Sequence, residues 1–403
     1  MARILRRAGH EAYFAGGCVR DMLLGLTPKD FDVVTDARPE RISELFDRTF
    51  QVGAAFGVVQ VVLRGVPYEV ATYRRDGPYR DGRRPESIEY SNQKEEDVQR
   101  RDFTINALLM DPDTGQILDF VEGRADLRAG LIRAVGDPRR RFAEDRLRML
   151  RAARFASRLD FEIEAETAAA IRELAAELTD VSGERIVAEV DAMLSADRPV
   201  AGLEMMEALG LGRSALPFLP RTAEGRTEIY RAIDAAFLSS EPEVEDPEDR
   251  LAVCWALAFD THGPDEAEAW MRRLKLSRDR IRRVRQLLSA RELLQAPDDH
   301  APVELARWAA DPRGSVLRRY ARGRGAARAE ARLDAWQARW QAQPLPARPV
   351  VGGNDLQALG LSPGPEFKRI LQEVDDQVLQ GRLATREEAM AWLRAHYGPN
   401  SRG

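Results

Sequence analysis

The pattern of hydrophobic and polar positions changes near residue 135. Before that point, short stretches rich in β-branched and aromatic residues alternate with turns and short helical patterns. Such stretches are typical of strands, and they predict strands over 11–17, 30–34, 56–65 and 67–74. A proline at the first helical position predicts a short helix over 39–46. The first third of the chain is therefore predicted to form a small α/β domain.

From about residue 139 onward, apolar residues recur at i, i+3, i+4 and i+7 almost everywhere. This spacing predicts amphipathic helices, most clearly over 141–159, 165–179, 183–194 and 200–212. The sequence thus predicts an α/β domain followed by an all-helical remainder.

Length and charge narrow these expectations. The chain has 403 residues, a length that predicts about two to four domains. Its formal net charge of −5 does not by itself suggest a nucleic-acid binder, but arginines crowd the stretch 139–158. Local charge matters more than the total for contact with phosphates. The segment 241–249 is acidic and contains prolines, which indicates a solvated linker or loop.

Cysteine content and apolar segments indicate the cellular compartment of the protein. Cys18 and Cys254 provide neither a disulfide framework nor a zinc-binding spacing. The first residues lack the apolar core and cleavage site of a signal peptide, and no apolar run approaches the length of a membrane span. We therefore expect no membrane association and a cytoplasmic protein, while the oligomeric state is left open.

Two aspartates on the predicted strand 30–34 form the first candidate site. Asp30 and Asp32 stand at i and i+2, so both carboxylates are expected on one face. Like charges so close are costly unless a cation lies between them. Oxygen ligands favour Mg²⁺, which uses one or two carboxylates together with substrate phosphates. The turn at Gly16 and Gly17 would let a backbone approach a phosphate. The segment therefore predicts metal-assisted transfer of a nucleotide.

Four motifs occur in a fixed order: GGCVRD (16–21), DFDVV (30–34), RRDFTINAL (100–108) and EDRLRMLRAARF (144–155). Together they resemble the successive motifs of the class II tRNA nucleotidyltransferases and bacterial poly(A) polymerases, within the polymerase-β superfamily. The resemblance is dense over about residues 10–190 and thinner beyond. A lone pair of aspartates would be weak evidence, whereas four ordered motifs are specific.

The resemblance implies an α/β nucleotidyltransferase head, a small mixed sheet with helices, followed by an all-α neck, body and tail. We expect boundaries near 135, 195 and 340, which give a catalytic head over 1–135, a base-recognising neck over 136–195, a body over 196–340 and a tRNA-binding tail over 341–403.

Roles for residues of the head follow from the same resemblance. Glu69 is implied as a third carboxylate beside the aspartates, and the alternative is a glutamate on a half-exposed strand. Gly17 and Arg20 are implied to hold the triphosphate, through a backbone N–H and a guanidinium. Outside this context Arg20 would be expected to form a surface pair with Asp21.

The RRDFTINAL motif contributes further groups. By resemblance, Arg101 contacts the nucleotide phosphates and Asp102 the ribose, and contact with a ribose hydroxyl would favour an NTP over a dNTP. The alternative for Asp102 is an N-capping role at a helix start, which is compatible with the first. Asn106 is expected to be a structural hydrogen-bonding residue at the base of the site.

The neck motif is implied to select the base. Asp145 and Arg148 are i, i+3 neighbours, and Arg151 and Arg154 continue that spacing. On an ordinary helix such a pair is a surface ion pair of a few tenths of a kcal/mol. In the family this spacing forms a protein template, in which a carboxylate and a guanidinium bind the Watson–Crick edge of cytosine or adenine. Glu144 is expected to support Arg148 or Arg151.

Four other segments carry expectations. The Gly-rich, charged stretch 75–85 is expected to be mobile, and it resembles the loop of family members that add adenosine, which argues against a CC-only enzyme. Residues 136–138 form either a hinge or a plain turn. Arg185 and Glu189 are expected to organise the neck. Asp260 stands where some relatives carry a His-Asp phosphohydrolase motif, but without the histidine, so a second hydrolase site is not expected.

We therefore expect an enzyme that adds CCA to tRNA 3′ ends with CTP, then ATP, and Mg²⁺. The 3′ hydroxyl would attack the α-phosphate and pyrophosphate would leave. The body and tail would recognise the tRNA acceptor arm by shape and phosphate contacts.

The same chemistry leaves open an A-adding tRNA nucleotidyltransferase or a poly(A) polymerase, although 52–62 lacks the basic stretch associated with the polymerases. A catalytically inactive RNA-binding protein is the alternative from another class. It would predict damage at the metal-binding or base-reading positions, and these are intact.

Overall fold

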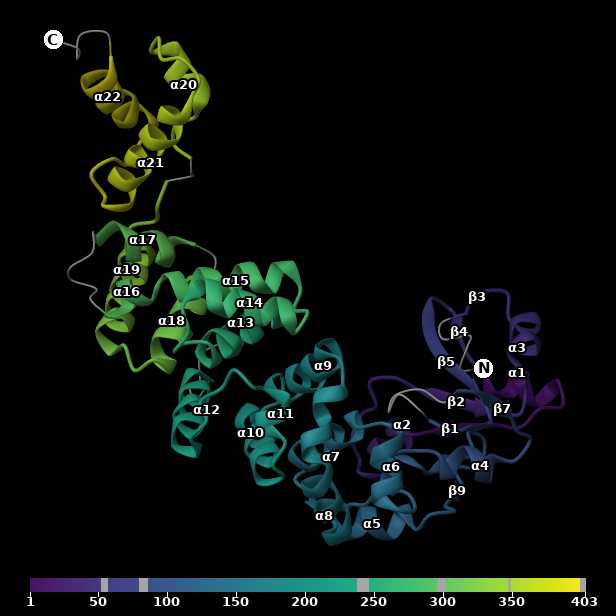
Figure 1. The fold of residues 1–403 in the computed structure, drawn as a ribbon. Coiled ribbons are helices and arrows are strands. Elements are labelled where there is room, and N and C mark those ends of the chain that lie inside the picture. Colours follow the sequence, from purple (N-terminus) through teal and green to yellow (C-terminus); the bar gives the residue numbers. More distant parts are fainter. Residues whose placement is uncertain are drawn as a thin grey trace. The chain divides into compact units, whose positions relative to one another are not determined.

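The computed structural model describes residues 1–51, 57–79, 86–237, 246–295, 302–311, 313–346 and 349–398. By its packing the chain divides into two units, Met1–Leu219 and Pro220–Gly403 (Figure 1). The predicted boundaries near 135 and 195 fall within the first unit, and that near 340 falls within the second.

The first unit contains a mixed sheet with the strand order β3-β4-β5-β2-β1-β8-β9. Only β2 and β5 are parallel, and the other neighbours run antiparallel. Two smaller sheets pair β6 with β7 and β10 with β11. The strands are β1 (Ala12–Ala15), β2 (Asp32–Thr35), β3 (Thr49–Phe50), β4 (Val58–Leu63), β5 (Val66–Thr72), β6 (Arg74–Asp76), β7 (Ile88–Tyr90), β8 (Leu109–Met110), β9 (Ile117–Leu118), β10 (Leu131–Ile132) and β11 (Glu162–Ile163).

The four predicted strands correspond to β1, β2, β4 and β5. The strand that carries the aspartates is shorter than predicted, because β2 begins at Asp32 and Asp30 lies in the preceding segment. The prediction that both aspartates share one face of a strand was therefore wrong in its premise. The strands that were not predicted span only two or three residues each, too few to show a period of two.

Both faces of the sheet are covered, which explains why the strands are rich in β-branched residues. Val33 belongs to a core cluster with Leu5 and Ile42, whereas its neighbour Val34 belongs to a cluster with Tyr73 and Val98. Successive side chains of a strand point to opposite faces. Helices α1 and α3 therefore cover one face and α4 contributes to the cover of the other.

Helices supply the rest of the first unit. They are α1 (Ala2–Arg7), α2 (Gly17–Leu23), α3 (Pro39–Leu45), α4 (Lys94–Gln99), η2 (Thr104–Asn106), α5 (Gly123–Ala129), α6 (Pro138–Glu144), α7 (Leu147–Leu159), α8 (Ala165–Leu174), η3 (Ala175–Asp180), α9 (Gly183–Leu194), α10 (Pro199–Ala208) and α11 (Gly212–Ala215).

The helix predicted over 141–159 is interrupted. Helix α6 ends at Glu144 and α7 starts at Leu147, because Asp145 has an extended backbone (φ −149°, ψ 104°). The Asp145 carboxylate accepts a hydrogen bond from the backbone N–H of Leu147 at 3.1 Å. An aspartate side chain that binds a nearby backbone N–H competes with helix continuation, which accounts for the break. Asp145 and Arg148 therefore do not lie on one helix, contrary to the prediction.

The second unit is helical throughout the part that the structure describes. Its helices are α12 (Ala223–Phe237), α13 (Pro247–Ala258), α14 (Pro264–Arg273), α15 (Arg278–Ser289), α16 (Arg291–Gln295), α17 (Pro302–Ala310), α18 (Gly314–Gly323), α19 (Ala327–Ala342), α20 (Gly353–Ala358), α21 (Pro365–Leu379) and α22 (Arg386–Tyr397). Asp246, within the acidic stretch 241–249, caps α13 by accepting from the backbone N–H of Glu248. Residues 247–249 form the first turn of α13, so the loop predicted over 241–249 was wrong for them, and residues 241–245 lie outside the described residues.

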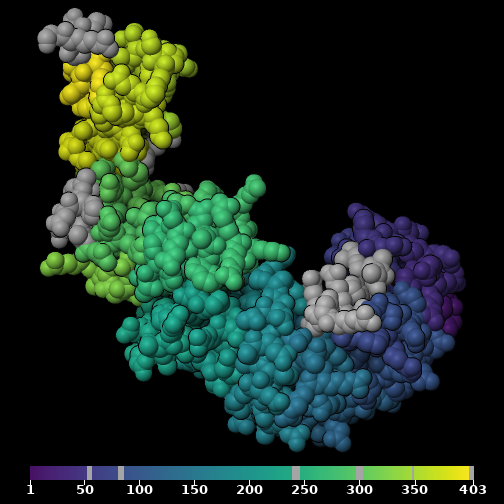
Figure 2. Space-filling view, viewed as in Figure 1, coloured from purple at the N-terminus to yellow at the C-terminus, as the bar shows by residue number. Residues whose placement is uncertain are grey.

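The last three helices have their own core. Ile370 and Val374 of α21 pack with Leu356 of α20 and Leu393 of α22, and this group is yellow-green to yellow in the space-filling view (Figure 2). Among the described helices, none combines the length and the apolar character that crossing a membrane would require.

Candidate active site

One cavity of the first unit, of about 350 Å³, brings together residues from three of the four motifs and Asp32 from the fourth. Most of the residues predicted to bind the nucleotide reach it. Its lining consists of Gly16, Gly17, Arg20, Asp32, Arg100, Arg101, Asp102, Asn106, Arg148, Arg151 and Phe155. Of the predicted site residues, Asp30, Glu69, Asp145 and Arg154 are not part of this lining.

The acidic side of the site is built by strand pairing. Asp32, the first residue of β2, pairs in register with Glu69 of the parallel strand β5, so both side chains project from the same face of the sheet. Burial raises the pKa of Asp32 to about 6, and the charges of Glu69 and Asp30 act in the same direction, while Arg101 opposes them. The three predicted carboxylates are thus electrostatically coupled.

Among the described residues, no three His, Cys, Asp or Glu side chains come together closely enough to bind an ion by themselves. Mg²⁺ does not need three, because it is bound by one or two carboxylates plus substrate phosphates. The surplus of negative charge that raises the pKa of Asp32 is what a cation would neutralise. Asp30 and Asp32, with Glu69 beside them, therefore fit a divalent cation that arrives with a triphosphate.

Gly16 allows the acidic side and the basic side to meet. Its φ of +78° is in the left-handed region, which favours glycine. A Cβ at this position would lie 3.3 Å from Nη1 of Arg101 and 3.7 Å from Oδ2 of Asp32. Gly17 follows as the first residue of α2, where the helix offers no acceptor to a backbone N–H. The turn thus exposes backbone between a guanidinium and a carboxylate.

Arg20 differs from the prediction in its surroundings. Its side chain is buried rather than free, and burial lowers its pKa although Asp21 opposes this. Nε and Nη2 donate to Oδ1 of Asp21 at 2.8 and 2.6 Å, and Nη1 donates to Oδ1 of Asn106 at 2.6 Å. The expected Arg20–Asp21 pair is therefore present, but inside the protein and at the wall of the cavity.

Arg101 and Asp32 both line the cavity and both lie close to Gly16. Nη2 of Arg101 donates to Oδ2 of Asp97 at 3.0 Å, and its Nε is buried without a hydrogen-bond partner in the described structure. Asp97 also accepts from Nε and Nη2 of Arg100. Sequence reasoning missed Asp97, although its spacing of three and four residues from the two arginines on a helical turn could have indicated it.

Asp102 is held by the neck. Nε and Nη2 of Arg151 donate to its Oδ2 at 2.9 and 2.7 Å. Burial alone would raise the pKa of Asp102, but the charge and hydrogen bonds of Arg151 outweigh burial, and the pKa falls to about 2. Asp102 does not cap the following turn, since the residue in that position is Phe103. The carboxylate is therefore ionised and faces the cavity.

The predicted base-reading residues have separate partners. Asp145 accepts from Nη1 and Nη2 of Arg185 at 3.1 and 2.8 Å, which ties it to α9. Arg148 donates from Nη1 to Glu144 at 2.8 Å and to the carbonyl of Arg141 at 3.0 Å. Glu144 thus supports Arg148, as expected, and Arg185 joins α9 to Asp145.

Arg154 does not reach the cavity, and it contributes indirectly. It donates to Glu189 at 2.6 Å, and its guanidinium carbon lies 4.3 Å from the ring centroid of Phe155. Arg20 and Arg151 also lie over this ring, at 5.0 and 5.2 Å. Phe155 therefore holds three cations near one another through contacts with its ring face, a role that the sequence pattern did not reveal.

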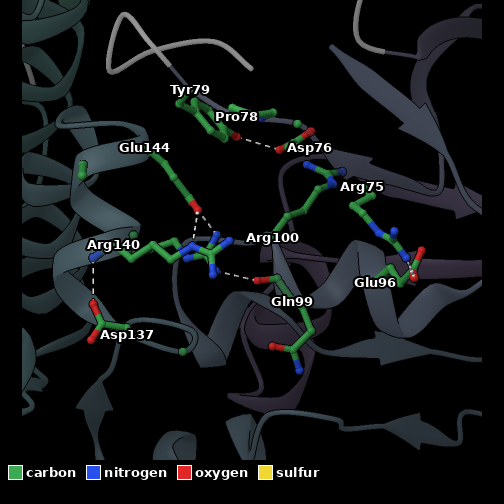
Figure 3. A pocket seen from close by; sticks show the side chains of 14 residues that line it. Arg75, Asp76, Pro78, Tyr79, Glu96, Gln99, Arg100, Asp137, Arg140 and Glu144 are labelled. Carbon is green, nitrogen blue, oxygen red and sulfur yellow. Dashed lines mark hydrogen bonds and ion pairs between the residues drawn. The ribbon is translucent and has the colours of Figure 1, made fainter. Parts of the chain in front are cut away.

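A larger cavity of about 730 Å³ lies next to the first and shares Arg100 with it. Figure 3 shows Tyr79 donating to Asp76 on one side of it, and Glu144 reaching in from α6. Residues 75–79 of the predicted mobile segment line this cavity. Arg75 and Asp76 belong to β6, so the loop does not start there, and residues 80–85 lie outside the described residues. On α6, Asp137 is the N-cap, consistent with a turn at 136–138.

In the second unit, Asp260 is engaged in structural contacts. The hydroxyl of Tyr320 donates to it at 2.6 Å, and Arg324 forms an ion pair with it at 3.3 Å.

Comparison with known proteins places this geometry in a family. The chain matches the poly A polymerase head domain over residues 12–133, the probable RNA and SrmB-binding site of polymerase A over 160–221, and a putative tRNA nucleotidyltransferase domain 2 over 249–393. The CCA-adding enzyme of Enterococcus faecalis is 35% identical over 396 residues, which cover 96% of this chain and 92% of that protein. The chain belongs to the CCA-adding enzyme family.

Other members of the CCA-adding enzyme family are similar to this chain in sequence and in structure. The CCA-adding enzyme of Levilactobacillus brevis is 33% identical over 395 residues, covering 96% of this chain and 94% of that protein. The crystal structure of the Bacillus stearothermophilus CCA-adding enzyme in complex with CTP superimposes with a TM-score of 0.77 at 30% identity, covering 97% of this chain and 94% of that one. The α/β head followed by helices is therefore the fold of the CCA-adding enzyme family, as the sequence predicted.

Proposed function

We propose that this protein adds CCA to the 3′ ends of tRNA, from CTP and ATP and with Mg²⁺, and that its active site is the 350 Å³ cavity. The observation that carries the proposal is the convergence on that cavity of Asp32, the Gly16–Gly17 turn, the RRD motif and the arginines of α7. Membership of the CCA-adding enzyme family supports the same activity.

In this proposal the acidic side holds the metal and the 3′ end of the RNA. Asp30 and Asp32 would bind Mg²⁺, with Glu69 next to them on β5. A bound divalent cation supplies activation of the attacking hydroxyl and neutralisation of charge on the leaving group. The protein itself has to align the 3′ hydroxyl with the α-phosphate and exclude water, since nucleotidyl transfer depends mainly on positioning and electrostatics.

The basic side would bind the triphosphate and the ribose. Arg101 has an unused buried Nε and lies beside Asp32, so it can donate to phosphates next to the metal. Gly17 can add a backbone N–H at the start of α2. Arg20 contributes its charge from the wall of the cavity. Asp102, ionised and fixed by Arg151, would accept a hydrogen bond from a ribose hydroxyl.

Base selection would use Asp145 and Arg148. Oδ2 of Asp145 accepts one N–H from Arg185, and a carboxylate oxygen has a second lone pair that can accept from the exocyclic amino group of cytosine or adenine. Nη1 of Arg148 donates to Glu144 and to the carbonyl of Arg141. Nη2 donates to the carbonyl of Arg100 at 3.3 Å. The five N–H groups of Arg148 exceed these contacts, so it can still donate to a ring nitrogen. Guanine and uracil present the reverse pattern.

We further propose that head, neck, body and tail span 1–135, 136–195, 196–340 and 341–403, that the helical parts bind the tRNA acceptor arm, and that the reaction takes place in the cytoplasm. The RNA-binding domain matched over 160–221 and the arginines of α7 support an RNA path along the neck.

The test uses three tRNA transcripts that end at the discriminator base, at C and at CC. Each is incubated with Mg²⁺ and with CTP or ATP, alone and together, and the products are resolved at single nucleotides. We expect the first transcript to grow to CCA and stop. Extension of the CC transcript alone, by one A, would instead mean an A-adding enzyme. A ladder of A residues would mean a poly(A) polymerase, and no extension at all would favour an inactive RNA-binding protein.

A further inference from the structure

Asn106 bridges the two halves of the basic side of the cavity. It lies in η2, is 6% exposed, and lines the cavity together with Arg20 and Asp102. Its Oδ1 accepts from Nη1 of Arg20 at 2.6 Å, and its Nδ2 donates to Oδ1 of Asp102 at 3.2 Å. One carboxamide therefore connects a guanidinium on α2 with a carboxylate that precedes η2.

The chemistry of the two neighbours requires an amide at this position. A guanidinium can only donate hydrogen bonds and an ionised carboxylate can only accept them. The carboxamide of Asn106 offers one acceptor and one donor, so a single orientation satisfies both neighbours. A carboxylate of the same size would face Asp102 with a second negative charge, and an apolar side chain would leave both contacts unmade.

The other contacts of Asp102 show what Asn106 adds. Oδ2 is held by Arg151, and Oδ1 accepts from the backbone N–H of Phe103 at 2.8 Å as well as from Asn106. Arg151 and Phe103 fix the carboxylate relative to the neck and to its own backbone. Asn106 joins it to Arg20 through hydrogen bonds. The other side-chain hydrogen bonds of Arg20 go to Asp21 on α2, and its guanidinium also lies over the ring of Phe155.

We propose that Asn106 is a positioning residue that couples Arg20 to Asp102 and thereby sets the preference of the site for ribonucleotides over deoxyribonucleotides. The inference rests on the proposed function, in which Arg20 acts on the triphosphate and Asp102 accepts from the ribose. With the spacing of the two groups fixed, a nucleotide whose phosphates lie against Arg20 presents its ribose hydroxyl to Asp102 at hydrogen-bonding distance. A nucleotide without that hydroxyl gains nothing from Asp102.

The test compares Asn106→Asp and Asn106→Ala with the wild type and with Asn92→Asp. Asn92 is exposed on the segment between β7 and α4, so its variant adds the same charge away from the cavity. Binding of CTP and of dCTP in the presence of Mg²⁺ is measured by calorimetry, and melting curves show that each variant is folded. In parallel, CTP and UTP incorporation into a tRNA ending at the discriminator base reports base choice.

We expect wild type and Asn92→Asp to bind CTP more tightly than dCTP. In Asn106→Asp, the ratio of the dCTP to the CTP dissociation constant should fall by at least about tenfold, which is the effect of losing a hydrogen bond to a charged group. Asn106→Ala should lose part of that ratio, and the CTP/UTP ratio should stay as in wild type. Equal weakening of CTP and dCTP in folded Asn106 variants would mean a merely structural role and would overturn the inference. Because calorimetry needs no tRNA, a wild type that binds CTP selectively but fails to extend tRNA would contradict the proposed function and not this inference.

Discussion

At the scale of single residues, the site is a set of charges that balance one another in pairs. Asp102 is matched by Arg151, Asp145 by Arg185, and Arg148 by Glu144. Asp32 is the exception, since neighbouring carboxylates and burial raise its pKa to about 6. The other charges named here are paired, whereas Asp32 is not. A cation that arrives with a triphosphate would stabilise the ionised form of Asp32.

Replacing Arg148 with alanine tests the reading of the base. Loss of its N–H groups should reduce the preference for CTP over UTP by about tenfold, the effect of one hydrogen bond to a charged donor, with a smaller change in triphosphate binding. Single-nucleotide incorporation with CTP and UTP measures the ratio. Arg139→Ala, which removes an exposed arginine paired with Glu173, is the matched control. An unchanged CTP/UTP ratio in Arg148→Ala would rule out its templating role.

Asp102 also predicts a dependence of stability on pH. Its pKa in the folded protein, about 2, lies below its ordinary value of 3.8, so its contribution is complete above pH 4 and is lost as the pH falls towards 2. The shift corresponds to about 2 kcal/mol. The free energy of unfolding of Asp102→Asn should therefore be lower than that of wild type at pH 6, and the difference should shrink on acidification. Denaturant titrations at pH 6 and at a pH near 2 measure the difference in the free energy of unfolding between Asp102→Asn and wild type. A difference that grows as the pH falls would contradict the pairing with Arg151.

At the scale of elements, the sequence predicted what periodicity and turn chemistry determine. Strands β1, β2, β4 and β5 and helices α3, α9 and α10 lie where the patterns placed them. The break between α6 and α7 was not predicted, because the apolar spacing runs through it and only the local bond from Asp145 to Leu147 interrupts the helix. The cavity lining was largely predicted from motifs. The contacts of Asp97 follow a local i+3 and i+4 spacing to Arg100 and Arg101 that was overlooked, whereas those of Phe155 with Arg20 depend on tertiary packing that no local pattern encodes.

Helix α5 provides a test of how the RRDFTINAL turn is supported. A Cβ at Gly123, the first residue of α5, would lie 2.2 Å from the carbonyl oxygen of Thr104 in η2. Gly123→Ala should therefore displace η2 and destabilise the fold by about 1–3 kcal/mol, as overpacking does. Gly263→Ala, where nothing lies within 4 Å of the added Cβ, should change little. Thermal unfolding of both variants measures the effect. Equal melting temperatures for Gly123→Ala and Gly263→Ala would show that η2 and α5 are not closely packed.

At the scale of the whole molecule, charge is distributed unevenly. The chain carries a net charge of −5, yet five arginines and two aspartates line the cavity, namely Arg20, Arg100, Arg101, Arg148, Arg151, Asp32 and Asp102. A basic cavity can attract a triphosphate although the protein as a whole is acidic. This accounts for a nucleotide-binding protein whose overall composition does not suggest one.

The central claim is that this cavity performs nucleotidyl transfer with a metal held at Asp32. The most direct measurement is CTP incorporation into a tRNA ending at the discriminator base by Asp32→Ala, alongside Asp47→Ala, which removes an exposed carboxylate elsewhere on the head. The affinity of each variant for the tRNA is measured in the same experiment. We expect no detectable incorporation by Asp32→Ala, wild-type incorporation by Asp47→Ala and unchanged tRNA affinity for both. Incorporation by Asp32→Ala at the wild-type rate would contradict this claim.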